Sequence, residues 1–168
     1  MQLTMYQASV VPILQMLGNL EAILDKAAAH CDGRKIKAEV FPQARLFPDM
    51  LPLSSQIQIA SDMAKGCVAR LSGVEAPKYE DYESTLPELK QRLAKTVEFI
   101  KSVKPEQIDG SEDKQINLKT GGQERTFSGK DYLFNFVLPN VYFHATTAYA
   151  ILRSGGVELG KRDFLGPL

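Results

Sequence analysis

Apolar residues recur at alternating spacings of three and four along four long stretches of this 168-residue chain, about 4–30, 52–73, 85–104 and 129–153. This periodicity limits the folds open to the chain more than any other feature, because it is the signature of amphipathic helices. At 1.5 Å per residue such helices are roughly 24 to 40 Å long. The pattern predicts an all-α fold in which four helices share one core.

Local signals mark the ends of these predicted helices. Pro52 suits the first turn of the second helix and Gly73 ends it. Thr85 and Glu88 have the spacing of a capping box, in which each side chain bonds the backbone of the other residue. Pro12 falls inside the first helix, where we expect a kink or a restart.

The segments between the helices also carry signals. Residues 115–127 alternate apolar and polar side chains around two glycines, which predicts a small β-hairpin between helices three and four. The aromatic and proline-rich connection 34–51 is expected to pack across one end of the bundle. The polar linker 74–84 is expected to be exposed, and the C-terminal segment 157–168 is expected to dock on the bundle through its apolar residues.

Composition excludes several classes of protein. The chain balances 20 basic against 20 acidic residues without a basic run, so no nucleic-acid partner is expected. No apolar stretch reaches the length of a membrane span and the first residues lack a basic secretory start, which predicts a cytoplasmic protein without a membrane partner. Cys31 and Cys67 fit no metal-ligand spacing and are expected to be free buried thiols. Residues 1–168 show no repeat or boundary and are expected to form a single domain.

Several motifs agree, in order and spacing, with a known family: MYQAS at 5–9, ILDKAAAH at 23–30, ARLFPDMLPLSSQIQIASDMAKG at 44–66 and the long segment NFVLPN to RDFLG at 135–166. Through these motifs the chain resembles the bacterial family of unknown function numbered nineteen ninety-three, within the DinB-like (damage-inducible) superfamily. The resemblance implies a DinB-like four-helix bundle with an up-down-down-up arrangement and a long crossing connection between helices two and three. It implies no particular activity, although superfamily relatives include thiol-dependent transferases and metal-dependent enzymes.

The superfamily's usual site is a divalent metal held by three histidines, two of them four residues apart on the last helix. This chain has only His30 and His144, and Ala148 stands four residues after His144. The superfamily metal site is therefore expected to be degenerate, with no cofactor. A divalent metal at His144 would need oxygen ligands such as Asp49 or Asp62.

His144 lies on the inward stripe of the fourth helix, between the polar residues Asn140 and Thr147. One interpretation is a core histidine that bonds a neighbouring carbonyl or hydroxyl and orders the bundle. The other is an internal cleft, in which Asn140 and Thr147 bind a ligand and His144 acts as a general base. The sequence leaves both open. His30 is expected to meet the carbonyls at the end of the first helix.

Asp49 and Arg45 precede the second helix in the segment RLFPDMLP. Asp49 is placed to cap that helix. Alternatively, Asp49 orients the His144 imidazole as a second catalytic residue while Arg45 binds an anionic ligand. Tyr149 is a further candidate for ligand binding, since it lies beside the apolar stripe with one end free to meet water.

Two functions remain open from the sequence. The first is a small-molecule binding or interaction protein with a degenerate metal site, whose ligand occupies a cleft in the bundle. The alternative is a metal- or thiol-dependent transferase or hydrolase that uses His144 with Asp49, which requires an open cleft ending at His144. Exposed apolar positions such as Val11 or Tyr149 would favour a homodimer.

Overall fold

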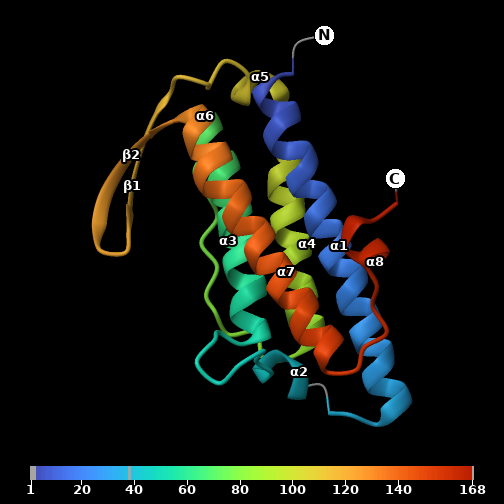
Figure 1. Ribbon diagram of the computed structural model, residues 1–168. Coiled ribbons are helices and arrows are strands. Elements are labelled where there is room, and N and C mark those ends of the chain that lie inside the picture. The colour runs from blue at the N-terminus through green and yellow to red at the C-terminus, as the bar shows by residue number, and fades with distance from the viewer. Residues whose placement is uncertain (1–2, 38, 168) are drawn as a thin grey trace.

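The computed structural model describes residues 3–37 and 39–167, which form four long helices, several short ones and a hairpin: the long helices are α1 (Met5–Arg34), α3 (Leu53–Ser72), α4 (Leu86–Ser102) and α7 (Leu138–Ser154). α1 and α7 run in one direction along the bundle, and α3 and α4 run in the other (Figure 1). Because α3 and α4 run in the same direction, the connection 74–84 from the end of α3 to the start of α4 returns along the length of the bundle (Figure 1). We call this connection the strap. The all-α prediction and the up-down-down-up arrangement are confirmed.

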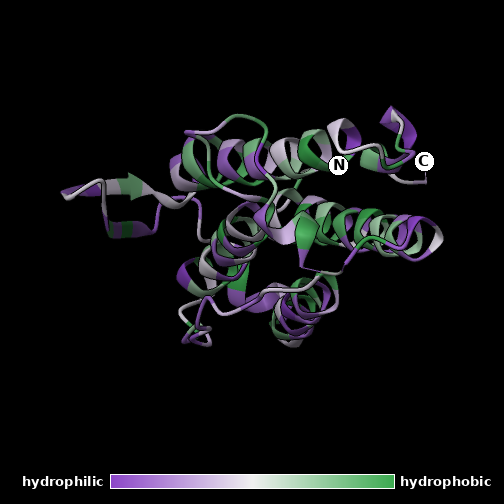
Figure 2. Cartoon of the chain, turned by 90° about the horizontal axis from the view of Figure 1, so that it is seen from below, coloured by the Kyte–Doolittle hydropathy of each residue, from purple (hydrophilic) through white to green (hydrophobic). Residues whose placement is uncertain are grey.

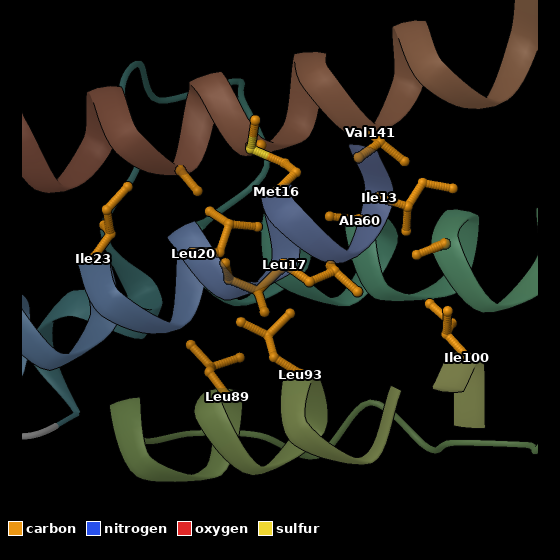
Figure 3. Packing of buried hydrophobic residues seen from close by; sticks show 14 of the residues in the cluster. Ile13, Met16, Leu17, Leu20, Ile23, Ala60, Leu89, Leu93, Ile100 and Val141 are labelled. Carbon is orange, nitrogen blue, oxygen red and sulfur yellow. The ribbon is translucent and has the colours of Figure 1, made fainter. Parts of the chain in front are cut away.

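The core is built from the stripes that the periodicity predicts. α3 packs against α4 and α7, and α1 packs against the same two helices, so that each long helix has two neighbours. The residues that meet at the centre are fully or almost fully buried (Figure 3); they include Ile13, Met16, Leu17, Leu20 and Ile23 of α1, Ala60 of α3, Leu89, Leu93 and Ile100 of α4, and Val141 of α7. Cys31 and Cys67 are free and buried, as predicted.

The helix ends follow local signals with one exception. The Glu88 amide donates to Thr85 Oγ1 at 3.4 Å and the Thr85 amide donates to Glu88 Oε2 at 2.9 Å, which completes the predicted capping box of α4. α1, however, runs unbroken through Pro12 and continues to Arg34. The predicted restart is wrong, because buried side chains on both sides of the proline hold the helix together. His30 consequently lies before the helix end and packs edge-on against the Phe41 ring.

The last helix differs from the single helix predicted for 129–153. It consists of α6 (Gly129–Asp131), the π-helical turn η1 (Tyr132–Val137) and α7. In η1 the Leu138 amide donates to the carbonyl of Leu133, five residues earlier. Pro139 follows and has no amide hydrogen to offer. The wider turn therefore occurs where the regular hydrogen-bond ladder already lacks a donor.

The predicted hairpin is confirmed as β1 (Gln115–Thr120) and β2 (Gln123–Ser128), two antiparallel strands that project from the bundle (Figure 2). Gly121 and Gly122 have φ angles of 58° and 78°, the left-handed conformation that a type I′ turn requires at both central positions. Ile116 is buried and anchors the base of the hairpin to the bundle.

Short helices close the two ends and one side of the bundle: α2 (Val40–Gln43), α5 (Pro105–Ile108) and α8 (Lys161–Leu165). α2 packs across one end as predicted, with Phe41 buried. The C-terminal segment docks on α1, where the Asn19 amide donates to the Phe164 carbonyl at 2.8 Å. Among the described residues no helix is both long enough and apolar enough to cross a membrane.

Candidate functional site

His144 lies in the interface between α3 and α7, where 9% of its surface is exposed. Its Nδ1 is 2.8 Å from Oε1 of Gln56, and the Gln56 amide nitrogen donates to the Leu51 carbonyl at 3.0 Å. Because the amide nitrogen is used in this way, the amide oxygen faces the imidazole and Nδ1 carries the proton. Burial lowers the pKa of His144, which favours this neutral form.

The polar neighbours predicted to line a cleft around His144 bond backbone groups of the same helical segment. The Asn140 side chain donates to the Phe136 carbonyl at 2.6 Å, and the Thr147 hydroxyl donates to the Phe143 carbonyl at 2.8 Å. Both polar side chains therefore donate to carbonyls four residues earlier along the last helical segment. None of the five main clefts in the described part of the chain is lined by His144.

Asp49 and Arg45 lie in the exposed loop before α3. Arg45 donates to the Met50 carbonyl within that loop, and α3 begins at Leu53 after the N-cap residue Pro52, without a side-chain cap. Capping by Asp49 is therefore wrong, and the group that orients the imidazole is Gln56. The loop bonds its own backbone, which leaves Asp49 facing solvent.

Tyr149 is half-buried and packs edge-on against Phe164, with ring centroids 6.1 Å apart. The docked C-terminal segment thus covers part of the Tyr149 ring. Val11 on α1 is 53% exposed, as a dimer contact would require.

The strap is held by a closed cluster of charges. Arg92 of α4, with a side chain only 1% exposed, pairs with Asp62 of α3 at 2.9 Å and with Asp81 and Glu83 of the strap at 2.9 and 3.1 Å. Burial by itself lowers the pKa of Arg92, but the hydrogen bond to Glu83 and the three carboxylate charges outweigh it and raise the pKa. Most of the strap is exposed, as its polar sequence predicts, but Glu83 is buried and holds the strap against α4.

Tyr79 of the strap completes this Arg92 cluster. The guanidinium of Arg92 lies 5.5 Å from the centre of the Tyr79 ring, and the Lys65 ammonium lies 4.6 Å from it. Both cations therefore lie within cation–π distance of the same ring, and the electron-rich ring attracts positive charge. Lys65 also pairs with Asp62 at 2.8 Å, so the cluster connects α3, α4 and the strap.

On the opposite side of Lys65, an open cleft of about 660 Å³ separates α3 from the hairpin. We call it the α3–β1 cleft. It is lined by charged, apolar and backbone groups of three segments: Asp62, Lys65, Gly66, Ala69, Arg70 and Gly73 of α3 and its end, Val74 and Ala76 of the strap, and Lys114, Gln115, Ile116 and Asn117 at the start of β1.

Arg70 is the distinctive group of this cleft. Its guanidinium donates to the Tyr132 hydroxyl at 3.0 Å and lies 5.8 Å from the centre of the Tyr132 ring. Burial raises the pKa of Tyr132 to about 12, so the hydroxyl stays neutral. A side chain at Gly66 would come within 2.4 Å of the Arg70 guanidinium, so glycine leaves the room that Arg70 occupies. No carboxylate of residues 3–37 or 39–167 pairs with Arg70.

Lys114 adds a second cation at the same end of the cleft. Its ammonium donates to the Leu71 carbonyl at 3.0 Å, near the C-terminus of α3, where a positive charge is favourable. It forms no ion pair within the described chain. Ala69, Val74 and Ile116 supply an apolar wall beside these cations. The cleft can therefore hold an anion that carries an apolar body.

The structure shows no group of three or more metal-ligating side chains in the part of the chain it describes. Asp62, which the sequence offers as a ligand for a metal at His144, belongs to the Arg92 cluster instead. Burial also raises the pKa of the Cys67 thiol to about 12, so this cysteine stays protonated and packs as an apolar group.

Sequence reasoning missed both Arg70 and Arg92. For Arg92 a signal exists, because it stands on the inward stripe of α4 between Leu89 and Thr96, where an arginine must find buried partners. For Arg70 no local signal exists, since its surroundings depend on where the hairpin and Tyr132 lie in space.

The helix order and directions (Figure 1) define the class of this protein, a DinB-like helical bundle. The chain belongs to the family described as Domain of unknown function (DUF1993), whose model matches residues 5–165. The crystal structure of a DinB family member protein from Shewanella denitrificans is 40% identical, with a TM-score of 0.88, and the match covers 97% of this chain and 92% of that one. No curated protein matches the chain.

Proposed function

We propose that this protein binds a small organic anion in the α3–β1 cleft. The observation that carries the proposal is the Arg70 guanidinium, which faces the cleft with a neutral hydroxyl as its hydrogen-bond partner and no carboxylate to balance it within the described residues. A guanidinium in this position has donors left to form charge-assisted hydrogen bonds with a carboxylate or phosphate.

The remaining walls support the same class of ligand. Lys114 lies at the Arg70 end of the cleft and adds positive charge. The apolar surface of Val74, Ala69 and Ile116 suits an aliphatic or aromatic body attached to the anion. Lys65 contributes less, because Asp62 already neutralises it at 2.8 Å.

Hexanoate tests this function, with the neutral hexanol as its counterpart. Titration into ¹⁵N-labelled protein is expected to shift the amide signals of Val74 and of residues 114–117 with hexanoate and much less with hexanol. Arg70→Gln is expected to weaken hexanoate binding at least tenfold, a loss of about 1.4 kcal/mol. The matched control is Arg153→Gln, an exposed arginine at the far end of α7, which is expected to bind as the unmodified protein does. Equal binding by Arg70→Gln contradicts the proposal.

The second candidate is a hydrolase or transferase that uses His144, and it rests on the state of the imidazole alone, because none of the five main clefts among the described residues reaches this side chain. The bond to Gln56 fixes the neutral imidazole with its proton on Nδ1, which leaves Nε2 as an acceptor able to act as a base. This function requires hydrolysis of an activated ester such as p-nitrophenyl acetate above the background rate. The activity must disappear in His144→Ala and persist in His30→Ala, which removes the other histidine.

A further inference from the structure

We propose that the anion recognised in the α3–β1 cleft is the C-terminal carboxylate of an extended peptide, which adds to the free edge of β1 as a third strand. The inference rests on the proposed function, because both require Arg70 to bind an anion. It goes further by naming the partner and the backbone groups that hold it.

The hydrogen-bond pattern of the hairpin shows which backbone groups are free. Thr120 and Gln123 flank a two-residue type I′ turn and therefore form a hydrogen-bonded pair. Because hydrogen-bonded and non-hydrogen-bonded pairs alternate along antiparallel strands, Leu118 and Ile116 also bond β2. Gln115 and Asn117 fall on the other positions, and their amide and carbonyl groups point away from β2.

These free groups lie at the cleft. Of the two strands only β1 lines the α3–β1 cleft, and it does so with the three consecutive residues 115–117. The outward-pointing amides and carbonyls of Gln115 and Asn117 have no other backbone partner among the described residues. An exposed edge of this kind accepts an extended peptide through main-chain hydrogen bonds.

The dimensions suit one added strand. Paired strands lie about 4.8 Å apart, and an extended peptide rises about 3.3 Å per residue. The volume of about 660 Å³ between β1, α3 and the strap is of the size that receives a few residues of extended chain. The helix α3 would form the far wall of the groove, with Ala69 toward the peptide side chains.

The positions of the cations fix the direction of the peptide. Lys114 directly precedes β1 and its ammonium bonds the carbonyl of Leu71, the residue after Arg70. Arg70 also bonds Tyr132, which follows the end of β2, opposite the start of β1. Both cations therefore stand at the beginning of β1. A C-terminal carboxylate placed there makes the peptide run antiparallel to β1.

The side-chain preference follows from the walls of the groove. Near the carboxylate the groove presents the apolar side chains of Ala69, Val74 and Ile116. Farther from the carboxylate, Asp62 and Lys65 form their own ion pair and present no net charge. The preferred partner is thus a free C-terminus with apolar residues next to the carboxylate.

A bead library of random pentapeptides with free C-termini, compared with the same library as C-terminal amides, tests the inference. The full chain is expected to be retained by acid beads rich in apolar C-terminal residues. The best sequence, titrated in solution, is expected to bind at least tenfold more weakly as its amide, and at least tenfold more weakly to Arg70→Gln than to Arg153→Gln.

Backbone pairing has its own signature in the ¹H–¹⁵N spectrum. On binding, the amide protons of Gln115 and Asn117 are expected to shift downfield and exchange more slowly with solvent. Those of Ile116 and Leu118, which already bond β2, are expected to change little. A peptide that binds without this alternation overturns the strand addition.

Three other outcomes are decisive. If hexanoate binds through Arg70 but no pentapeptide binds more tightly than hexanoate, the peptide inference fails and the small-anion function stands. If neither binds, both fail. If the protein has twice its monomer mass in solution and the amides of Gln115 and Asn117 are protected without peptide, a second copy occupies the edge and the inference is wrong.

Discussion

The two sides of α3 place an arginine in opposite surroundings, since Arg92 is buried and Arg70 is exposed. Toward α4 and the strap, Arg92 is enclosed by three carboxylates and an aromatic ring. Toward the hairpin, Arg70 meets only the hydroxyl and ring of Tyr132. A balanced charge inside a protein holds segments together, whereas a charge without a counter-ion beside an open cleft is available to a ligand. The comparison separates an arginine that holds segments together from one that we propose binds a ligand.

The largest effect is expected from Arg92→Met. This change leaves Glu83, a buried carboxylate, without its cation, and removing one partner from a buried ion cluster costs about 3 kcal/mol or more. The free energy of unfolding measured with urea is the test. Arg34→Met, at the exposed end of α1, serves as the control and is expected to change stability by less than about 0.5 kcal/mol. A similar small change in Arg92→Met would erase the distinction between the two arginines.

Asp62→Asn tests the residue that both sides share. The change removes one carboxylate from Arg92 and is expected to lower the free energy of unfolding by about 1 kcal/mol. It also releases Lys65 from its ion pair, so hexanoate is expected to bind more tightly in the cleft. Asp81→Asn is the matched control, since Asp81 pairs with Arg92 but does not line the cleft. Tighter binding in both variants would argue against a role for Lys65.

A pH titration extends the comparison to His144, the uncharged polar side chain that contacts α3 from α7. Burial lowers the pKa of His144 below its ordinary value of 6.5. The unfolded chain therefore takes up a proton first as the pH falls, and stability decreases from about pH 6.5 toward the lower pKa of the folded state. Urea unfolding at pH 7 and pH 5 is expected to show a smaller difference in His144→Gln than in His30→Gln. Equal differences in the two variants would exclude His144 as the cause.

The smallest change in stability is expected from Arg70→Gln. The lost hydrogen bond to Tyr132 lies near the surface, and no buried carboxylate is left alone, so the free energy of unfolding is expected to change by less than about 1 kcal/mol. Tyr132→Phe removes the same hydrogen bond and is expected to match this value while still binding hexanoate. A large destabilisation by Arg70→Gln would show that this arginine, too, is structural.

The fold follows from the sequence to a greater extent than the site does. The positions of the helices depend on residues three and four apart, and the turn of the hairpin depends on Gly121 and Gly122. Both features can therefore be predicted from short stretches of sequence. The burial of Glu83 depends on Arg92, nine residues later and on another element. The sequence therefore predicts correctly that most of the strap is exposed, but it does not show that Glu83 is buried, because the partner of Glu83 lies elsewhere in the chain.

The site depends on contacts that no local pattern contains. His144 was singled out correctly as a polar residue on an inward stripe, but its partner Gln56 stands 88 residues away. The α3–β1 cleft exists because the hairpin lies beside α3. That placement requires Gly129, where a side chain would overlap the Ser111 carbonyl at 1.9 Å. Such a requirement becomes visible only when the two segments are seen together.

The π-helical turn at Tyr132–Val137 interrupts an otherwise continuous helical segment. It changes the direction in which the side chains before the turn point, relative to those of α7. It holds one residue more than an α-helical turn, and each residue of an α-helix rotates the chain by about 100°. Deleting the exposed Asn135 would restore a regular helix, keep the α7 seam in register and swing Tyr132 away from Arg70. One residue in this turn thus determines whether Tyr132 faces Arg70, so the shape of the α3–β1 cleft can change without any change in the core of the bundle.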